Sequence, residues 1–128
     1  MSQSTVLILL PQTAYDNPGD GSPYNVVGEK QPAAAYYLGN RDLQTVQYSL
    51  SKCTANVIIE ASLATEPDDN DWFSVYKLVA NNDASEGTDP KLASDANSFE
   101  NIEGNFVYLR AKLEDFRNGS VNFIKVSY

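Results

Sequence analysis

The residues of this 128-residue chain with the clearest chemical potential are the clustered oxygens of Asp68-Asp69-Asn70-Asp71. Calcium takes about six to eight oxygen ligands, and a turn can supply them from carboxylates and backbone carbonyls. The stretch lacks the turn glycine and the final glutamate of an EF-hand loop. We therefore predict a solvated turn in which Asp71 caps the entry to the strand at Trp72, and we keep Asp68, Asp69 and Asp71 as the candidate calcium ligands.

The composition lacks most of the usual catalytic side chains, since histidine is absent and Cys53 is the single cysteine. Without imidazole there is no Ser-His-Asp or Cys-His pair and no histidine-ligated zinc. We expect Cys53, near the start of a predicted strand, to be a buried and unreactive side chain. Paired carboxylates can hydrolyse glycosidic bonds, but here they fall mostly in turns, where their role is solvation. The sequence predicts no enzyme and no cofactor.

The charge of the chain limits its partners. It has 17 acidic and 9 basic side chains, a formal net charge of −8. Nucleic acids and anionic membranes repel such a surface, so we expect neither as a partner. The apolar run Val6–Leu10 has no basic region before it and is too short for a signal peptide or a membrane span, which indicates synthesis in a cytoplasm.

The elements that hold these residues are predicted to be antiparallel strands. Two strand-turn-strand blocks stand out: Asn56–Leu78 turns through Glu66–Asp71, and Asn105–Tyr128 turns at Arg117-Asn118-Gly119. Alternation of apolar and polar residues predicts one buried face on each strand. The residues expected to face the core are Val46, Tyr48, Leu50, Val57, Ile59, Ala61, Leu63, Val107, Leu109, Ala111 and Leu113.

About seven strands with turn signals between them predict an all-β fold, an antiparallel β-sandwich of jelly-roll or immunoglobulin-like type with long loops. We expect a single domain over residues 1–128, with an N-terminal arm or loop within 1–32. Val6–Leu10 is expected to pair within the sheet, the alternative being an arm onto a neighbouring subunit. Tyr15–Pro32 is predicted to be a surface loop, Ala33–Leu38 a short strand, and Lys91–Glu100 a helical turn at most.

Three segments carry a resemblance to known proteins: Ile59–Pro67, Asp71-Trp72-Phe73 and Gly104–Lys112. Over roughly the C-terminal half, the chain resembles small virion structural proteins of tailed phages, especially those that infect marine cyanobacteria. The resemblance implies a virion component made in the host cytoplasm, either a capsid decoration protein or a subunit of the neck, tail or fibre. Its expected partners are other copies of itself and virion proteins such as the major capsid protein.

The aromatic residues are the expected contacts in such an assembly. The chain has eight tyrosines, whose rigid rings and polar tips suit both strands and interfaces. Phe106, Tyr108, Arg110 and Lys112 are predicted to form an outward row, which is either cross-strand packing on the cation stems or a contact surface. The predicted interface residues are Tyr15, Tyr24, Tyr36, Tyr37, Phe106, Tyr108 and Arg110.

A function of another class is also compatible with these segments, because an acidic turn between a strand and a Trp-Phe strand recurs in carbohydrate-binding and discoidin-like β-sandwich modules. In that alternative an exposed Trp72 or Tyr76 stacks on a sugar ring, while Asp69 or Asn70 binds its hydroxyls. Burial of Trp72 is the deciding feature. We expect a lone tryptophan at the start of a strand to lie in the core, which disfavours the alternative.

Overall fold

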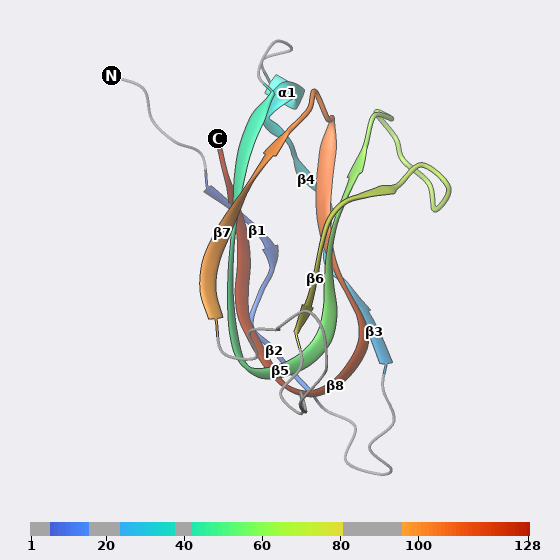
Figure 1. Cartoon of the computed structure of the whole chain (residues 1–128). Coiled ribbons are helices and arrows are strands. Elements are labelled where there is room, and N and C mark those ends of the chain that lie inside the picture. Colours follow the sequence, from blue (N-terminus) through green and yellow to red (C-terminus); the bar gives the residue numbers. More distant parts are fainter. Residues whose placement is uncertain (1–5, 16–23, 38–41, 81–95) are drawn as a thin grey trace.

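The computed structural model describes residues 6–15, 24–37, 42–80 and 96–128 (Figure 1). Within these ranges the regular structure is antiparallel strand apart from one helical turn, so the all-β prediction is confirmed. The elements are β1 (Val6–Leu10), β2 (Thr13–Ala14), β3 (Tyr24–Val27), β4 (Gln31–Pro32), α1 (Ala34–Tyr37), β5 (Leu43–Ser62), β6 (Phe73–Ala80), β7 (Ala96–Glu103) and β8 (Tyr108–Ser127).

The sheet is organised around β5 and β8, which pair from Thr45↔Ser127 to Ser62↔Tyr108. The free edge of β8 is lined in turn by β1, β2, β3 and β4, while the free edge of β5 is lined by β7 and then β6. Every other described strand therefore pairs with one of these two.

Both long strands bend near their middle, at the bottom of Figure 1. Lys52, Asp115 and Gly119 have positive φ angles of 50°, 59° and 80°, and the β5–β8 register shifts around them. An extra residue at a bulge reverses the side-chain alternation. The buried positions of β5 accordingly change from even numbers, as at Val46, to odd numbers, as at Val57. The apolar side chains thus stay on the concave face through the bend.

The bend divides the sheet into two halves. The β7 half comprises β1, β7 and the strand segments Leu43–Leu50 and Val121–Ser127, and the β6 half comprises β3, β4, β6 and the segments Ala55–Ser62 and Tyr108–Leu113. Their inner faces meet, because the buried side chains of both belong to one cluster. Its members are Leu9, Leu10, Ala33, Val46, Tyr48, Leu50, Cys53, Ala55, Val57, Ile59, Ala61, Ile102, Leu109, Ala111, Leu113, Phe116, Val121, Ile124 and Val126.

One of the two predicted strand-turn-strand blocks is confirmed and the other is wrong. β5 and β6 pair on either side of the acidic turn, as at Val57↔Leu78. By contrast, β8 does not reverse at Arg117-Asn118-Gly119, since both of its ends pair with β5. The turn-like residues there bend the strand. Leu63 was also wrongly placed in the core, because β5 ends at Ser62 and leaves it exposed.

The segment Tyr15–Pro32 is not a loop throughout. β3 and β4 pair with Phe116–Lys112 and Leu109–Tyr108 of β8, and residues 16–23 lie outside the described residues. β1 pairs with the end of β8, which agrees with the prediction that Val6–Leu10 belongs to the sheet.

Two short elements differ from the predictions in type. Ala34–Tyr37 is a helical turn rather than a strand, with the Tyr36 N–H donating to the Ala33 carbonyl at 3.0 Å, and its alanines favour helix. Ala96–Glu103 is a strand rather than a helical turn, because it pairs with Leu43–Leu50 of β5. Residues 91–95 of that prediction lie outside the described residues.

Candidate functional site

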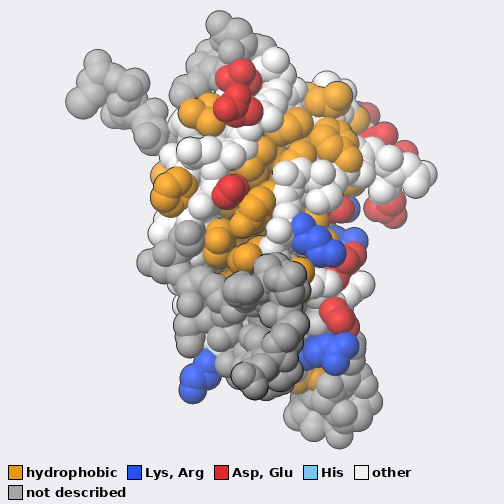
Figure 2. Space-filling model, in the orientation of Figure 1, with side chains coloured by type: hydrophobic (Ala, Val, Ile, Leu, Met, Phe, Trp, Pro, Cys, Tyr) orange, Lys and Arg blue, Asp and Glu red, His pale blue; other side chains and the backbone are white. Residues whose placement is uncertain are grey.

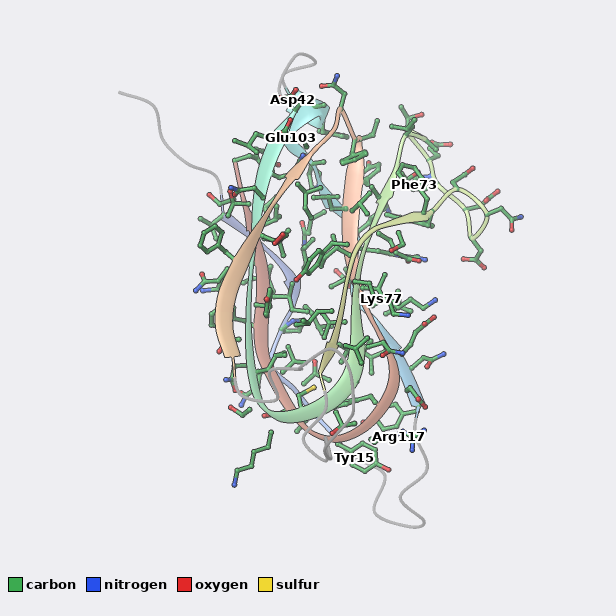
Figure 3. All side chains as sticks on the ribbon, viewed as in Figure 1. Tyr15, Asp42, Phe73, Lys77, Glu103 and Arg117 are labelled. Carbon is green, nitrogen blue, oxygen red and sulfur yellow. The ribbon has the colours of Figure 1, made fainter. Side chains whose placement is uncertain are left out.

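The outer face of the β6 half carries a row of cationic side chains. Ile58 of β5 pairs with Lys77 of β6 on one side and with Lys112 of β8 on the other, so both lysines share its outward face. Ile58 is only 7% exposed although it faces away from the core. The apolar stems of flanking lysines cover such a side chain while their ammonium groups reach solvent. Figure 3 shows Lys77 projecting away from the sheet.

The adjacent row contains an ion pair stacked on an aromatic ring. Arg110 Nε lies 2.7 Å from Glu60 Oε1, and the two side chains are 18% and 14% exposed. The Arg110 guanidinium carbon lies 4.2 Å from the centroid of the Trp72 ring. A guanidinium over an indole gains a cation–π attraction, and the carboxylate satisfies its charge. The pair therefore holds Trp72 against the outer face.

Two tyrosines and a lysine continue this surface toward the start of β8. The rings of Tyr36 and Tyr108 have centroids 5.3 Å apart, and Lys30 Nζ lies 5.4 Å from the Tyr108 centroid. We call the whole surface the cation–aromatic face. It consists of Lys30, Tyr36, Trp72, Lys77, Tyr108, Arg110 and Lys112.

The charge of the cation–aromatic face is opposite to that of the chain. Lys112 pairs with Glu114 at 3.0 Å, and Arg110 pairs with Glu60. Four cations against two carboxylates leave a net charge of +2, in a chain of net charge −8. On the right of Figure 2, Lys and Arg side chains lie among Asp and Glu side chains. The exposed cations of this face attract an anionic partner.

The acidic turn, Glu66–Asp71, protrudes beyond the sheet between β5 and β6 (Figure 1). The Asp68 N–H donates to Asp71 Oδ2 at 2.9 Å, the Asn70 N–H donates to Asp68 Oδ1 at 2.9 Å, and the Asp71 N–H donates to the Asp68 carbonyl at 3.1 Å. Asp71 therefore caps the start of the turn itself rather than the strand at Trp72. These carboxylates remain exposed.

The candidate calcium ligands are not gathered around a common centre. Within the described part of the chain, no group of three or more His, Cys, Asp or Glu side chains is arranged to hold a metal ion. The physical reason is local, since the carboxylates of Asp68 and Asp71 are directed at backbone N–H groups of their own turn.

Two of the predicted interface tyrosines lie at the bend. The rings of Tyr15, Tyr24 and Phe116 are mutually 5.4 to 5.7 Å apart, and Phe116 is fully buried. The Tyr15 N–H also donates to the Gly119 carbonyl at 2.9 Å. Tyr15 and Tyr24 are therefore partly buried and pack against the core, where they hold β2 and β3 to β8.

The remaining predicted contacts divide between the outer face and the core. Tyr36, Tyr108 and Arg110 belong to the cation–aromatic face, and the side chain of Tyr37 lies outside what the structure describes. Phe106 was wrongly assigned to the outward row. Its ring packs over Gly104, against the core and against Phe73 at 5.8 Å, because the residues just before β8 are not strand and the alternation does not extend to them.

The aromatic residues of the carbohydrate-binding alternative are not equivalent. Trp72 is half-buried beneath Arg110 rather than in the core, so the prediction of a core tryptophan is wrong. Tyr76 stacks on Tyr48 at 6.4 Å and packs against the core. Burial, followed by its hydrogen bond with Tyr48, raises the pKa of Tyr76, as expected for an inward phenol.

A groove marks the place where the two edges of the folded sheet approach one another. It has a volume of about 520 Å³ between β1 and the β3–β4 segment, and its lining includes Ile8, Leu10, Val26 and Glu29. Gln31 Nε2 closes one end by donating to the Ile8 carbonyl at 3.1 Å. The groove is largely apolar and has few polar groups that would orient a ligand.

The thiol of Cys53, the candidate nucleophile in the sequence, is buried away from solvent. Cys53 is fully buried at the bend, which confirms the prediction, and burial raises the pKa of its thiol to about 11. A thiol that stays protonated at neutral pH is a poor nucleophile.

Lys30 and Lys77 are the members of the cation–aromatic face that the sequence did not indicate, and Trp72 was expected in the core. Lys77 lies near Lys112 only because both pair with Ile58. Lys30 lies near Tyr108 only because β4 pairs with β8. The alternation of side chains along β6 was the one sequence pattern that could have indicated Lys77, since it places Lys77 on the opposite face of the sheet from Leu78.

None of the described helical residues forms a stretch long and apolar enough to cross a membrane. Comparison with known proteins finds no matching family model, no similar curated protein and no similar solved structure.

Proposed function

We propose that this protein is a non-enzymatic structural component of a tailed-phage particle, a capsid decoration protein that docks on the particle surface as a homo-oligomer. The observation that carries the proposal is the placement of exposed apolar side chains on the outermost strands. Val6 and Ile8 of β1, Val27 of β3, Phe73 of β6 and Phe99 of β7 are between 41% and 60% exposed.

These strands each have one described neighbour in the sheet, so their outer edges carry apolar side chains beside backbone groups that no described strand pairs with. Burying a large apolar side chain fully is worth about 1.5–3 kcal/mol, and an edge strand is a template for pairing with another chain. Contact through these edges suits a protein that docks on a capsid lattice. The absence of histidine and the engagement of Glu60 in an ion pair agree with a non-enzymatic role.

Quantitative peptide mass spectrometry of phage particles purified from the source tests the proposal. A copy number comparable with that of the major capsid protein is expected for a decoration protein. A few to a few dozen copies per particle would instead indicate a neck, tail or fibre subunit. Absence of the chain from intact particles would overturn the virion assignment.

Carbohydrate binding is the second candidate, because Trp72 is only half-buried and follows the exposed Asp69 and Asn70 closely in the sequence. Arg110 already covers one face of the indole, which leaves less of the ring for a sugar. Trp72 is the single tryptophan of the chain, so titration of tryptophan fluorescence with a glycan panel tests this candidate directly. A saturable emission shift in the wild-type protein would support this candidate, and an unchanged spectrum would exclude a glycan site at Trp72.

A further inference from the structure

We infer that the homo-oligomer forms head to tail, with the acidic turn of one copy bound on the cation–aromatic face of the next. The inference rests on the proposed function, since it names the two surfaces through which the copies bind. The occupant is a second copy of this chain because the chain itself carries both complementary charges, one set on the exposed acidic turn and the other on the cation–aromatic face, which begins at Trp72, the residue after the turn.

The acidic turn has the properties of the inserted partner. Glu66, Asp68, Asp69 and Asp71 place four exposed carboxylates within six residues, at the tip of a hairpin that stands clear of the sheet (Figure 1). The hydrogen bonds of Asp68 and Asp71 fix the backbone of the turn, so little conformational entropy is lost on binding. In the described residues, none of these carboxylates is paired with a described cation of its own chain.

The cation–aromatic face has a matching charge and size. Lys77 and Lys112 stand on strands separated by β5, which places them about 10 Å apart, and Tyr108 lies about 13 Å along β8 from Lys112. A β-turn less than about 7 Å across fits on this surface. Rigid rings and a fixed Arg110–Glu60 pair line it, and the ammonium groups of Lys30 and Lys77 remain exposed.

The geometry of the contact fixes the kind of assembly. Each copy uses two different surfaces, so the contact is heterologous, and its repetition gives a closed ring or an open chain rather than a two-fold dimer. Every copy in a ring then has both surfaces occupied. Because the attraction is between exposed charges, high salt weakens it.

Charge reversal on each surface tests the inference by sedimentation velocity at low and high ionic strength. The turn variant carries Glu66→Lys and Asp69→Lys, which avoids the carboxylates that build the turn, and the face variant carries Lys30→Glu and Lys77→Glu. We expect the wild-type protein to associate at low salt and dissociate at high salt. Each variant is expected to lose at least ~10-fold in association constant.

Combining all four substitutions is the decisive arm, because it recreates opposite charges with their places exchanged. We expect the combined variant to regain salt-sensitive association. Matched controls change the same charges elsewhere: Asp42→Lys with Glu103→Lys at the end near α1 (Figure 3), and Lys52→Glu with Lys125→Glu. We expect both controls to retain at least half of the wild-type association constant.

A wild-type protein that stays monomeric at low salt, association that high salt does not weaken, or a combined variant that stays monomeric would each overturn the inference. Particle mass spectrometry keeps the two proposals separate. If the chain is present in particles but the charge-reversed variants still associate, the head-to-tail contact is wrong and the virion role stands. If the chain is absent from particles but associates in the expected salt-sensitive way, the virion role is wrong and the head-to-tail contact stands.

Discussion

The β7 half and the β6 half have different outer surfaces although the same two strands build both. On the β7 half, Thr45 Oγ1 donates to Asn101 at 2.8 Å and Asn122 Nδ2 donates to Ser49 and Ser51 at 3.1 Å. The β7 half also has one contact between a cation and an aromatic ring, Lys125 Nζ at 4.3 Å from the Phe123 centroid, whereas the β6 half has the Glu60–Arg110 ion pair stacked on Trp72. The inner faces are alike. The difference shows that the core specifies the fold, while one outer face carries the candidate binding chemistry.

The largest expected effect is at the bend that joins the two halves. A Cβ atom at Gly119 would overlap the backbone of Lys52, and the φ of 80° there favours glycine. We expect Gly119→Ala to lower the free energy of unfolding by about 4 kcal/mol, or to prevent folding. Urea denaturation measures it, with Ser120→Ala as the neighbouring control. A loss below about 1 kcal/mol would show that the bend does not depend on this glycine.

The two halves should respond equally to substitutions in their shared core. Ile59 of the β6 half and Ile124 of the β7 half are both fully buried in one cluster. We expect Ile59→Ala and Ile124→Ala each to cost about 3 kcal/mol, in a single cooperative transition. Denaturation followed by both fluorescence and circular dichroism checks this. Two separated transitions would mean that the halves unfold independently.

The buried thiol of Cys53 at the bend makes the free energy of unfolding depend on pH in the alkaline range. Burial raises the pKa of Cys53 from 9.0 to about 11, so the folded state keeps a proton that the unfolded state releases. Stability therefore falls as the pH rises above 9, by about 2 kcal/mol at pH 11. Comparing the slope of unfolding free energy against pH between wild-type protein and Cys53→Ala isolates this contribution. Identical slopes would contradict it.

The smallest effects distinguish the two outer faces directly. Arg110→Ala leaves the half-buried Glu60 without its partner and uncovers Trp72, so we expect a loss of about 1.5 kcal/mol that shrinks at high salt. Asn122→Ala removes neutral hydrogen bonds and should cost about 1 kcal/mol at any salt concentration. Unfolding in low and high salt provides the comparison. A salt-independent loss for Arg110→Ala would mean that packing, not charge, dominates there.

Local patterns predicted the parts of the fold that depend on neighbouring residues. The alternation of Val57, Ile59 and Ala61 predicted the inner face of β5, and the acidic turn predicted its hairpin with β6. The bend at Gly119 was misread because a glycine after asparagine also suits a tight turn. What distinguishes a bulge from a hairpin is the strand that pairs on both sides of it, and this pairing is a long-range property.

In the candidate site, too, local sequence patterns predicted some positions and pairing between distant strands determined the others. The outward positions of Tyr108, Arg110 and Lys112 followed from alternation along one strand. The stacking of Arg110 on Trp72, and the positions of Lys30 and Lys77, depend on register between strands distant in sequence. No periodicity within a single strand contains that information.

The pairing of β1, β2, β3 and β4 with β8 alone has a consequence for biosynthesis. These four strands leave the ribosome before β5, β6 and β7, and their hydrogen-bonding partner, Tyr108–Ser127, emerges after all of them. The apolar run Val6–Leu10 therefore stays without its strand partner while about a hundred further residues are translated, and contacts over such sequence separations form slowly. Chaperone binding to the nascent N-terminal segment is where we expect the cell to protect this protein.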